Sequence, residues 1–173
     1  MIGWNGKPYH YTSGLAMTGG RKYEKPPGYT FTYGYAEAQI RVPRGKGFWP
    51  TFWLLPASYN SRPEVDILEA RGSNPNRVNF NLHFTGVDTG GSYTGPDYSA
   101  GYHTFAVDWQ PSALAFYVDG VERWRYTGPG IPSEPEYLVL NLAVGGIYDG
   151  APDASTPFPS SLDVDYVRVW QHP

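Results

Sequence analysis

The chain has 173 residues, of which 21 are Gly and 17 are Pro, well above the average usage of about 7% and about 5%. Both residues interrupt regular structure and a typical helix needs about 11 or 12 residues, so a helical bundle and an α/β fold with long helices are excluded. The 6 Trp, 15 Tyr and 8 Phe exclude a disordered chain, and the net charge of −3 offers no basic surface for nucleic acid or an anionic membrane. No apolar run reaches the roughly 18 residues of a membrane span. We therefore expect one all-β domain, a sandwich or barrel, over residues 1–173.

Strand patterns follow one another at short intervals after a turn-rich N-terminal stretch. From Val78 to Thr85, apolar side chains alternate with amides and a histidine, which is typical of a strand with one buried face. Asp119-Gly120 is a strong signal for a two-residue hairpin turn. The predicted strands are 30–42, 48–55, 64–69, 78–85, 113–118, 121–126, 136–144 and 162–171.

Several of these strands carry aromatic or amide side chains on the face opposite the apolar one. Aromatic rings can stack on sugar rings and amides can bond sugar hydroxyls, so such a face suits a carbohydrate-binding cleft. A solvated sheet face explains the same pattern, and periodicity alone leaves both interpretations open.

Three acidic residues lie within the six-residue segment Glu64-Val65-Asp66-Ile67-Leu68-Glu69. In a regular strand, Glu64 and Asp66 share one face and Glu69 points to the other. One β-bulge between Asp66 and Glu69 would bring all three to the same face, and bulges are frequent beside active sites. Two carboxyl groups that face a cleft are the minimum equipment for glycoside hydrolysis. The alternative is a charged edge strand with Glu69 in solvent.

This segment resembles the E-x-D-x-x-E signature of glycoside hydrolase family 16, in the form found in its laminarinases and also in its agarases and carrageenases. Further stretches that resemble the family, in the same order, are Tyr11–Gly14, Tyr33–Glu37, Gly47–Trp53, Leu82-His83, Tyr102–Trp109, Tyr117–Gly120, Leu140–Gly146 and Val164–Val169. The resemblance spans roughly residues 10–171 and implies a concanavalin-like β-jelly roll, a sandwich of two curved antiparallel sheets with a concave substrate cleft. Compared with the family, the chain is short at its N-terminus.

The resemblance also implies roles for the three acids. Glu64 matches the nucleophile, Glu69 the general acid/base and Asp66 the assisting acid between them. Because the family retains anomeric configuration, the carboxyl groups of Glu64 and Glu69 should lie about 5–5.5 Å apart. Glu64 must be ionised to attack, and Glu69 must begin protonated, which burial and neighbouring negative charge favour.

Five further residues match positions that line the family's cleft. The implied substrate-binding residues are Trp49, Trp53, His83, Trp109 and Asn141. Trp49 and Trp53 would stack on glucosyl units, with a place in the core as the alternative. His83 would lie near the acids, either as a hydrogen-bonded structural residue or in contact with substrate, and packing or network roles are equally open for Trp109 and Asn141. Trp170, in the last predicted strand, we assign to the core.

A structural Ca²⁺ is implied by the resemblance as well, since Asp165 matches one of the family's calcium ligands. The other ligands would be carbonyl groups of the N-terminal segment, where this chain is short. Because Ca²⁺ takes six to eight oxygen ligands, one aspartate does not make a site by itself. No cofactor is expected for catalysis.

The implied activity is endo-acting, retaining hydrolysis of β-1,3-glucan, extending to mixed β-1,3/1,4-glucan. The alternatives are a non-catalytic carbohydrate-binding jelly roll, a transglycosylase, or action on agarose or carrageenan. The scarcity of Lys and Arg argues against strongly sulfated carrageenan, yet Arg71 and Arg77 follow the acidic segment and leave one anionic subsite open.

Partners and compartment are inferred more indirectly. We expect a polysaccharide substrate, a monomer, and no nucleic acid or membrane partner. The chain has no Cys, which removes disulfides and thiolate chemistry without fixing the compartment. Family resemblance implies secretion, although Met1-Ile2-Gly3-Trp4 does not begin a signal peptide.

Overall fold

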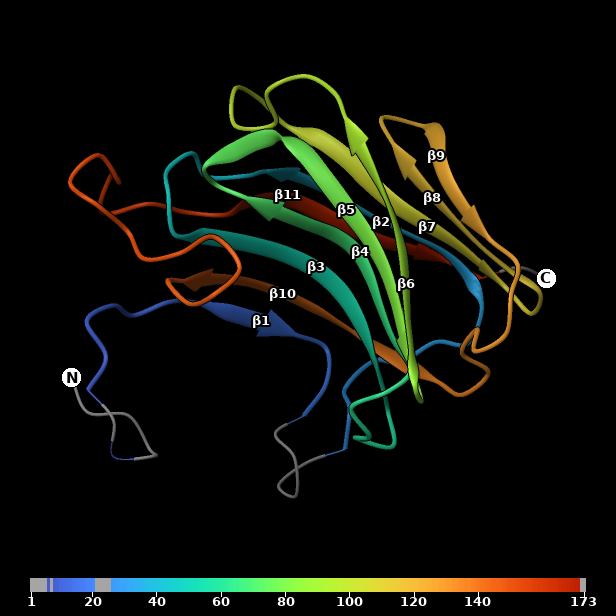
Figure 1. Cartoon of the computed structure of the whole chain (residues 1–173). Helices are drawn as coiled ribbons and strands as arrows, with labels where there is room; N and C mark the ends of the chain where they lie inside the picture. The colour runs from blue at the N-terminus through green and yellow to red at the C-terminus, as the bar shows by residue number, and fades with distance from the viewer. Residues whose placement is uncertain (1–5, 7, 21–25, 172–173) are drawn as a thin grey trace.

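The computed structural model describes residues 6, 8–20 and 26–171, and these form eleven strands and no helix. The strands form two antiparallel sheets that lie face to face (Figure 1). One sheet has the order β1 (Leu15–Met17), β10 (Glu136–Val144), β3 (Phe48–Pro56), β4 (Glu64–Arg71), β5 (Asn74–Phe84) and β6 (Val87–Thr94). The other has the order β11 (Asp163–Trp170), β2 (Gly34–Arg41), β7 (His103–Gln110), β8 (Ala113–Val118) and β9 (Val121–Tyr126). The predicted all-β sandwich is therefore confirmed, and the described segments include no helix able to cross a membrane.

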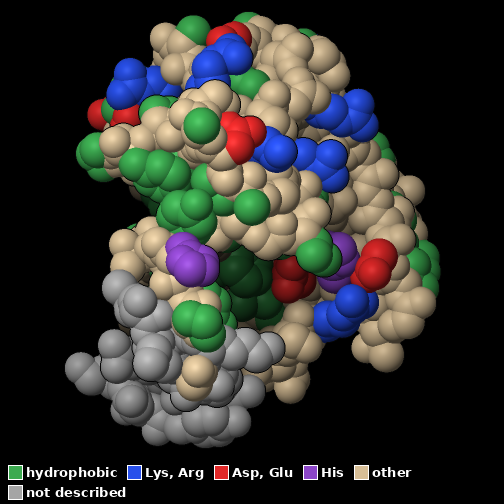
Figure 2. Space-filling model, turned by 60° about the vertical axis from the view of Figure 1, so that its left-hand side comes forward, with side chains coloured by type: hydrophobic (Ala, Val, Ile, Leu, Met, Phe, Trp, Pro, Cys, Tyr) green, Lys and Arg blue, Asp and Glu red, His purple; other side chains and the backbone are tan. Residues whose placement is uncertain are grey.

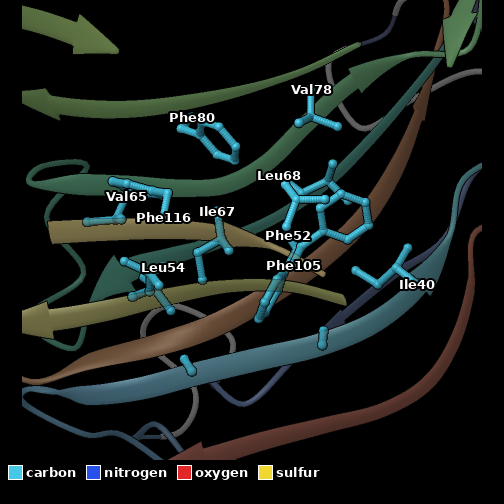
Figure 3. Close-up of a cluster of buried hydrophobic side chains, with 14 of the residues drawn as sticks. Ile40, Phe52, Leu54, Val65, Ile67, Leu68, Val78, Phe80, Phe105 and Phe116 are labelled. Atoms are coloured by element: carbon cyan, nitrogen blue, oxygen red, sulfur yellow. The ribbon is translucent and has the colours of Figure 1, made fainter. Parts of the chain in front are cut away.

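One hydrophobic core lies between the sheets. Alternate side chains of each inner strand point into it, for example Phe52 and Leu54 from β3 and Phe105 from β7, as Figure 3 shows. In β4 the adjacent residues Ile67 and Leu68 are both fully buried there. Burial of such side chains contributes roughly 1.5–3 kcal/mol each, so this core holds both sheets in fixed positions. The opposite face of the six-stranded sheet remains free to form a binding surface.

The predicted strand bounds hold closely where alternation is strong. Strands β8, β9 and β10 have the predicted limits, and Asp119 and Gly120 between β8 and β9 adopt φ angles of 51° and 73°, as a type I′ hairpin turn requires. Strands β1, β6 and β7 were not predicted. β6 contains Gly91, where a Cβ atom would lie 2.5 Å from the ring of Trp124, so close packing on β9 explains a glycine in this strand.

The assignment of Trp170 to the core is wrong. Its side chain is 49% exposed, and Val164 and Val167 on the same strand are also exposed. The reason is the position of β11 at the edge of its sheet, beside β2 alone. An apolar pattern in an edge strand does not guarantee burial on either face.

Candidate active site

A β-bulge in β4 places three carboxyl groups on one face of the six-stranded sheet. Asp66 pairs with Asn81 of β5 and Glu69 with Asn79, so three steps along β4 correspond to two along β5. The pairing with β3 shifts at the same place. The bulge predicted between Asp66 and Glu69 is confirmed. It turns Glu69 to the side of Glu64 and Asp66, while Ile67 and Leu68 fill the core.

The three acids line one cavity of about 140 Å³. Its lining comes from strands β3, β4 and β10 and consists of Trp49, Thr51, Trp53, Glu64, Asp66, Glu69, Asn141 and Ala143. Figure 2 shows this face of the molecule hollowed, with acidic and hydrophobic side chains in the depth of the hollow. The cavity therefore combines carboxyl groups with two indole rings, as predicted for a carbohydrate cleft.

Glu69 is buried and receives two hydrogen bonds. The indole Nε1–H of Trp49 donates to Oε1 over 2.9 Å, and the Nδ2–H of Asn81 donates to Oε2. Burial and the negative charge of Asp66 raise the pKa of Glu69 to about 7, although the bond from Trp49 acts in the opposite direction. Glu69 can therefore exchange a proton near neutral pH.

Glu64 lies at the start of β4 and faces Asp66 and His83. One ligand atom from each of these three residues lies within 4.8 Å of the others. Burial, followed by the charge of Asp66, raises the pKa of Glu64 to about 7, while the charge of His83 lowers it. Glu64 and Glu69 therefore both exchange protons near neutral pH.

His83 connects the acids to the neighbouring strand β6. Its Nε2 lies 3.1 Å from Asp66 Oδ2, and its Nδ1 lies 2.9 Å from Asp88 Oδ1. Hydrogen bonding to Asp66 is the largest cause that raises the pKa of His83 to about 9, so the imidazole is a cation at neutral pH. Glu64, Asp66 and His83 are the one group of His, Asp and Glu in the described ranges with metal-ligand spacing. A protonated His83 is a poor metal ligand, and the ring serves here as a hydrogen-bonded cation.

Asn141 orients the second tryptophan. Its Oδ1 accepts hydrogen bonds from Thr51 Oγ1 at 2.7 Å and from the Trp53 indole Nε1–H at 2.8 Å. Trp53 is half-buried, with part of its ring open to the cavity. Asn141 thus lines the cavity and also fixes an aromatic wall, which combines the two roles that the sequence left open.

Tyr148, which sequence reasoning missed, packs against a tryptophan that lines the cavity. Its ring stacks on that of Trp49, with the two ring centroids 4.5 Å apart. The guanidinium carbon of Arg71 lies 4.7 Å from the centroid of the Tyr148 ring. Its hydroxyl accepts a hydrogen bond of 2.6 Å from Asn79 Nδ2. The residue lies in the loop after β10, where no alternation indicates a direction.

Asp149, the next residue, anchors this loop. Its buried carboxylate accepts hydrogen bonds from the Gly47 amide at 2.8 Å and the Ser73 amide at 3.1 Å, and from the Ser73 hydroxyl. These bonds join the loop to the start of β3 and to the turn between β4 and β5. The bonds of Asp149 to Gly47 and to Ser73 therefore fix the loop that places Tyr148 against Trp49.

Trp109 does not belong to the cleft, and its prediction as a substrate-binding residue is wrong. It lies on β7 in the other sheet, 0% exposed, in edge-to-face contact with Phe31 and Tyr33. Its indole Nε1–H donates to the Pro132 carbonyl over 3.0 Å. A side chain enclosed between the sheets cannot reach a ligand on the far face.

Asp165 lies on β11, where the pairing with β2 shifts between Val164 and Tyr166. Its side chain is exposed, and no other Asp, Glu or His in the described part of the chain gathers with it at metal-ligand distances. Residues 1–5 and 7, which fall in the N-terminal segment expected to supply carbonyl ligands, lie outside the described residues. The described residues contribute one carboxylate of the six to eight oxygens that Ca²⁺ takes, and the calcium site stays a prediction.

This chain is similar in sequence to curated glucan-degrading enzymes. The model of the family "Glycosyl hydrolases family 16" matches residues 20–168. Over 166 residues the chain is 36% identical to the glucan endo-1,3-beta-glucosidase A1 of Niallia circulans, an alignment that covers 80% of this chain and 24% of that protein. It is 31% identical over 196 residues to the beta-glucanase of Rhodothermus marinus, covering 95% of this chain and 65% of that one.

The fold also matches a solved structure. The endo-beta-1,3-glucanase from Pyrococcus furiosus superposes with a TM-score of 0.88 at 33% identity, covering 99% of this chain and 71% of that chain. The chain thus spans between about a quarter and two thirds of the two curated relatives named above. On the family match, together with the jelly-roll sheets and the bulged acidic strand, the chain belongs to glycosyl hydrolase family 16.

Proposed function

We propose that the chain is a retaining endo-β-1,3-glucanase, with Glu64 as the nucleophile, Glu69 as the general acid/base and Asp66 as the assisting acid. The observation that carries the proposal is the bulge in β4, which turns the buried Glu69 to the side of the half-buried Glu64, so that both carboxyl groups, each with a pKa of about 7, line one cavity with two tryptophans. The relatives named for β-1,3-glucan support the substrate class.

In the first step, Glu69 gives its proton to the glycosidic oxygen as the bond from that oxygen to the anomeric carbon breaks. The ionised carboxylate of Glu64 attacks the same carbon from the opposite side and forms a covalent glycosyl ester. Asp66 raises the proton affinity of Glu69, and it holds the cationic His83 beside the nucleophile. That cation favours the ionised form of Glu64, which is the form that attacks.

In the second step, the roles reverse. Glu69, now ionised, takes a proton from water, and the resulting hydroxide oxygen attacks the anomeric carbon. The bond to Glu64 breaks, the carboxylate leaves, and two inversions give net retention. The bonds from Trp49 and Asn81 stabilise the ionised Glu69 that this step requires.

Substrate binding would rely on the aromatic walls. Trp49 and Trp53 both line the cavity, and the bond from Trp53 to Asn141 fixes the plane of its indole. We infer that these rings stack on glucosyl units on either side of the cleaved bond. We also propose a monomer without a catalytic cofactor, because the double displacement needs only the carboxyl groups of Glu64 and Glu69. A polymeric substrate supports action outside the cell.

Two measurements test the proposal. Release of reducing ends from laminarin should fall by at least ~10³-fold in Glu64→Gln and in Glu69→Gln, with melting temperatures close to that of the unsubstituted chain. Glu122→Gln, an exposed glutamate on β9, is the matched control and should retain activity. Laminarin binding without hydrolysis in the unsubstituted chain would instead favour the non-catalytic binding role.

Azide rescue assigns the two roles. With an activated aryl β-laminaribioside, azide should restore turnover of Glu64→Ala as the α-glycosyl azide, because azide then replaces the nucleophile in a single inversion. With Glu69→Ala it should give the β-glycosyl azide, since azide replaces water in the second step. The reverse pattern would exchange the two roles. Chromatography of oligosaccharide products separates hydrolysis from transglycosylation.

A further inference from the structure

A second cavity, of about 290 Å³, lies beyond the acids on the same sheet. It is lined by Arg71, Asn74, Arg77 and Asn79, so every lining side chain is polar and can donate hydrogen bonds. Arg71 ends β4, and the other three residues lie on β5. Nothing in the proposed reaction uses this cavity.

The second cavity is continuous with the surface beside the acids. Arg77 and Asn79 also line a larger open cavity of about 370 Å³ that extends along β5 and β6 to Asn81 and His83. Asn81 and His83 bond directly to Glu69 and Asp66. A glycan bound across the acids and extended along β5 would therefore reach the two arginines.

Neither arginine is neutralised by a carboxylate in the described part of the chain. Other arginines are: Arg41 pairs with Asp163, and Arg62 pairs with Asp88. Arg71 instead lies over the ring of Tyr148, and Arg77 Nη2 donates to the Ser92 hydroxyl over 2.7 Å. Two like charges that line one cavity repel each other, and an anion bound between them would remove that cost.

The position of Arg71 over the Tyr148 ring is compatible with binding an anion. A guanidinium that stacks on an aromatic ring keeps the N–H groups at its edge free, and this edge matches a carboxylate or sulfate with two parallel hydrogen bonds. Tyr148 is itself held, because Asn79 donates to its hydroxyl and its ring stacks on Trp49. Neutral hydroxyl groups would not compensate the two charges in the same way.

We propose that this end of the cleft is a subsite for an anionic substituent, a sulfate or a carboxylate, carried by the glycan. Arg71 and Arg77 would bind the anionic oxygens, with Asn74 beside them. The inference rests on the proposed function for the position of the glycan chain. It adds a charge preference that neutral laminarin does not use.

The test is a titration of the full chain that carries Glu64→Gln, so that turnover does not interfere. Three probes of equal length are compared by calorimetry: neutral laminari-oligosaccharide, its sulfated form and its carboxymethylated form. We expect at least one anionic form to bind about tenfold more tightly than the neutral one, with the gain decreasing as salt rises. The comparison of sulfate with carboxymethyl identifies the preferred anion.

Variants locate the effect. Arg71→Met/Arg77→Met should abolish the anionic preference and leave neutral binding within about twofold. Arg125→Met/Arg168→Met removes the same charge from the other sheet and should keep the preference. Should the first pair fail to fold, Arg77→Gln alone should reduce the preference. Equal binding of all three probes overturns the inference, as does a preference that survives Arg71→Met/Arg77→Met.

Failure of this inference differs from failure of the proposed function. Hydrolysis of laminarin without any charge preference removes the anionic subsite and leaves the glucanase. Charge-selective binding that depends on Arg71 and Arg77, without hydrolysis of any probe by the unsubstituted chain, keeps the subsite and removes the glucanase.

Discussion

The indole of Trp49 is hydrogen-bonded to Glu69, with its Nε1–H 2.9 Å from Oε1. One side chain therefore forms part of the cavity wall and also contacts a glutamate that titrates near neutral pH. In the proposed reaction, this contact would couple recognition of a sugar ring to control of a proton. A change of the aromatic residue should affect both.

Trp49→Phe keeps an aromatic ring and removes the N–H donor. Because that donor favours the ionised form of Glu69, we expect the pKa of Glu69 to rise and the alkaline limb of the kcat/KM profile to move to higher pH. Loss of a hydrogen bond to a charged group costs about 1.5–3 kcal/mol, so kcat should fall roughly 10- to 100-fold if the bond is made in the transition state. The measurement is the pH dependence of laminarin hydrolysis.

Trp53→Phe is the matched control, since Trp53 lies on the same strand and donates to Asn141 rather than to an acid. Its KM should rise while both limbs of the pH profile stay in place. Equal shifts of the profile in the two variants would contradict a specific role for the bond to Glu69.

His83→Gln should move the acidic limb of the profile to higher pH. The imidazolium lowers the pKa of both Glu64 and Glu69, so its removal leaves both carboxyl groups harder to ionise. A nucleophile that must be ionised then becomes active only at higher pH. His103→Gln, which removes a histidine bonded to Asp119 on the other sheet, should leave the profile unchanged. An unshifted acidic limb in His83→Gln would argue against the cation's role.

Asp149→Ala should destabilise the chain through the loop that carries Tyr148. It leaves the buried amide of Gly47 and the part-buried amide of Ser73 without their carboxylate partner, at a cost of about 1–3 kcal/mol. For a domain of this size, that lowers the melting temperature by roughly 2–4 °C per kcal/mol. Asp153→Ala removes an exposed aspartate of the same region and should have little effect. Calorimetry of both variants is the measurement, and equal melting temperatures would refute the anchoring role.

Glu136→Gln should stabilise the chain at alkaline pH. Glu136 is 0% exposed, neither carboxyl oxygen has a hydrogen-bond partner among the described residues, and burial raises its pKa well above the usual value. The folded state therefore binds this proton more tightly than the unfolded state. The associated stability is lost as pH rises from the ordinary pKa of glutamate to the raised one, by about 1.4 kcal/mol per pH unit.

The expected result for Glu136→Gln is a melting temperature close to that of the unsubstituted chain near pH 4 and a growing advantage toward pH 8. Glu122→Gln is the control with a pKa shift of the opposite sign, because Arg125 lowers the pKa of Glu122. The pair is exposed, so this substitution should change the melting temperature little at any pH. A constant difference between Glu136→Gln and the unsubstituted chain at all pH values would show that Glu136 is already ionised in the fold.

The sequence predicted the site where local rules apply. The conflict between Glu69 and the alternation of its strand implied a bulge, and the bulge is present. Trp109 could not be placed in this way, since alternation tells which residues share a face but not which face meets the other sheet. Tyr148 was invisible because its direction depends on Asp149, whose partners Gly47 and Ser73 are distant in the chain. Sequence thus predicted contacts within strands better than contacts between loops.

Because of the bulge in β4, both the packing of the core and the position of Glu69 depend on the number of residues between Asp66 and Glu69. Ile67 and Leu68 fill adjacent places in the core, and Glu69 reaches the cavity because both of them precede it. If either residue were deleted, the strand could keep its core contacts only by turning Glu69 away from the cavity. It could keep Glu69 in the cavity only by leaving a void in the core. This part of β4 can therefore accept substitutions that change side-chain shape, but it cannot accept insertions or deletions.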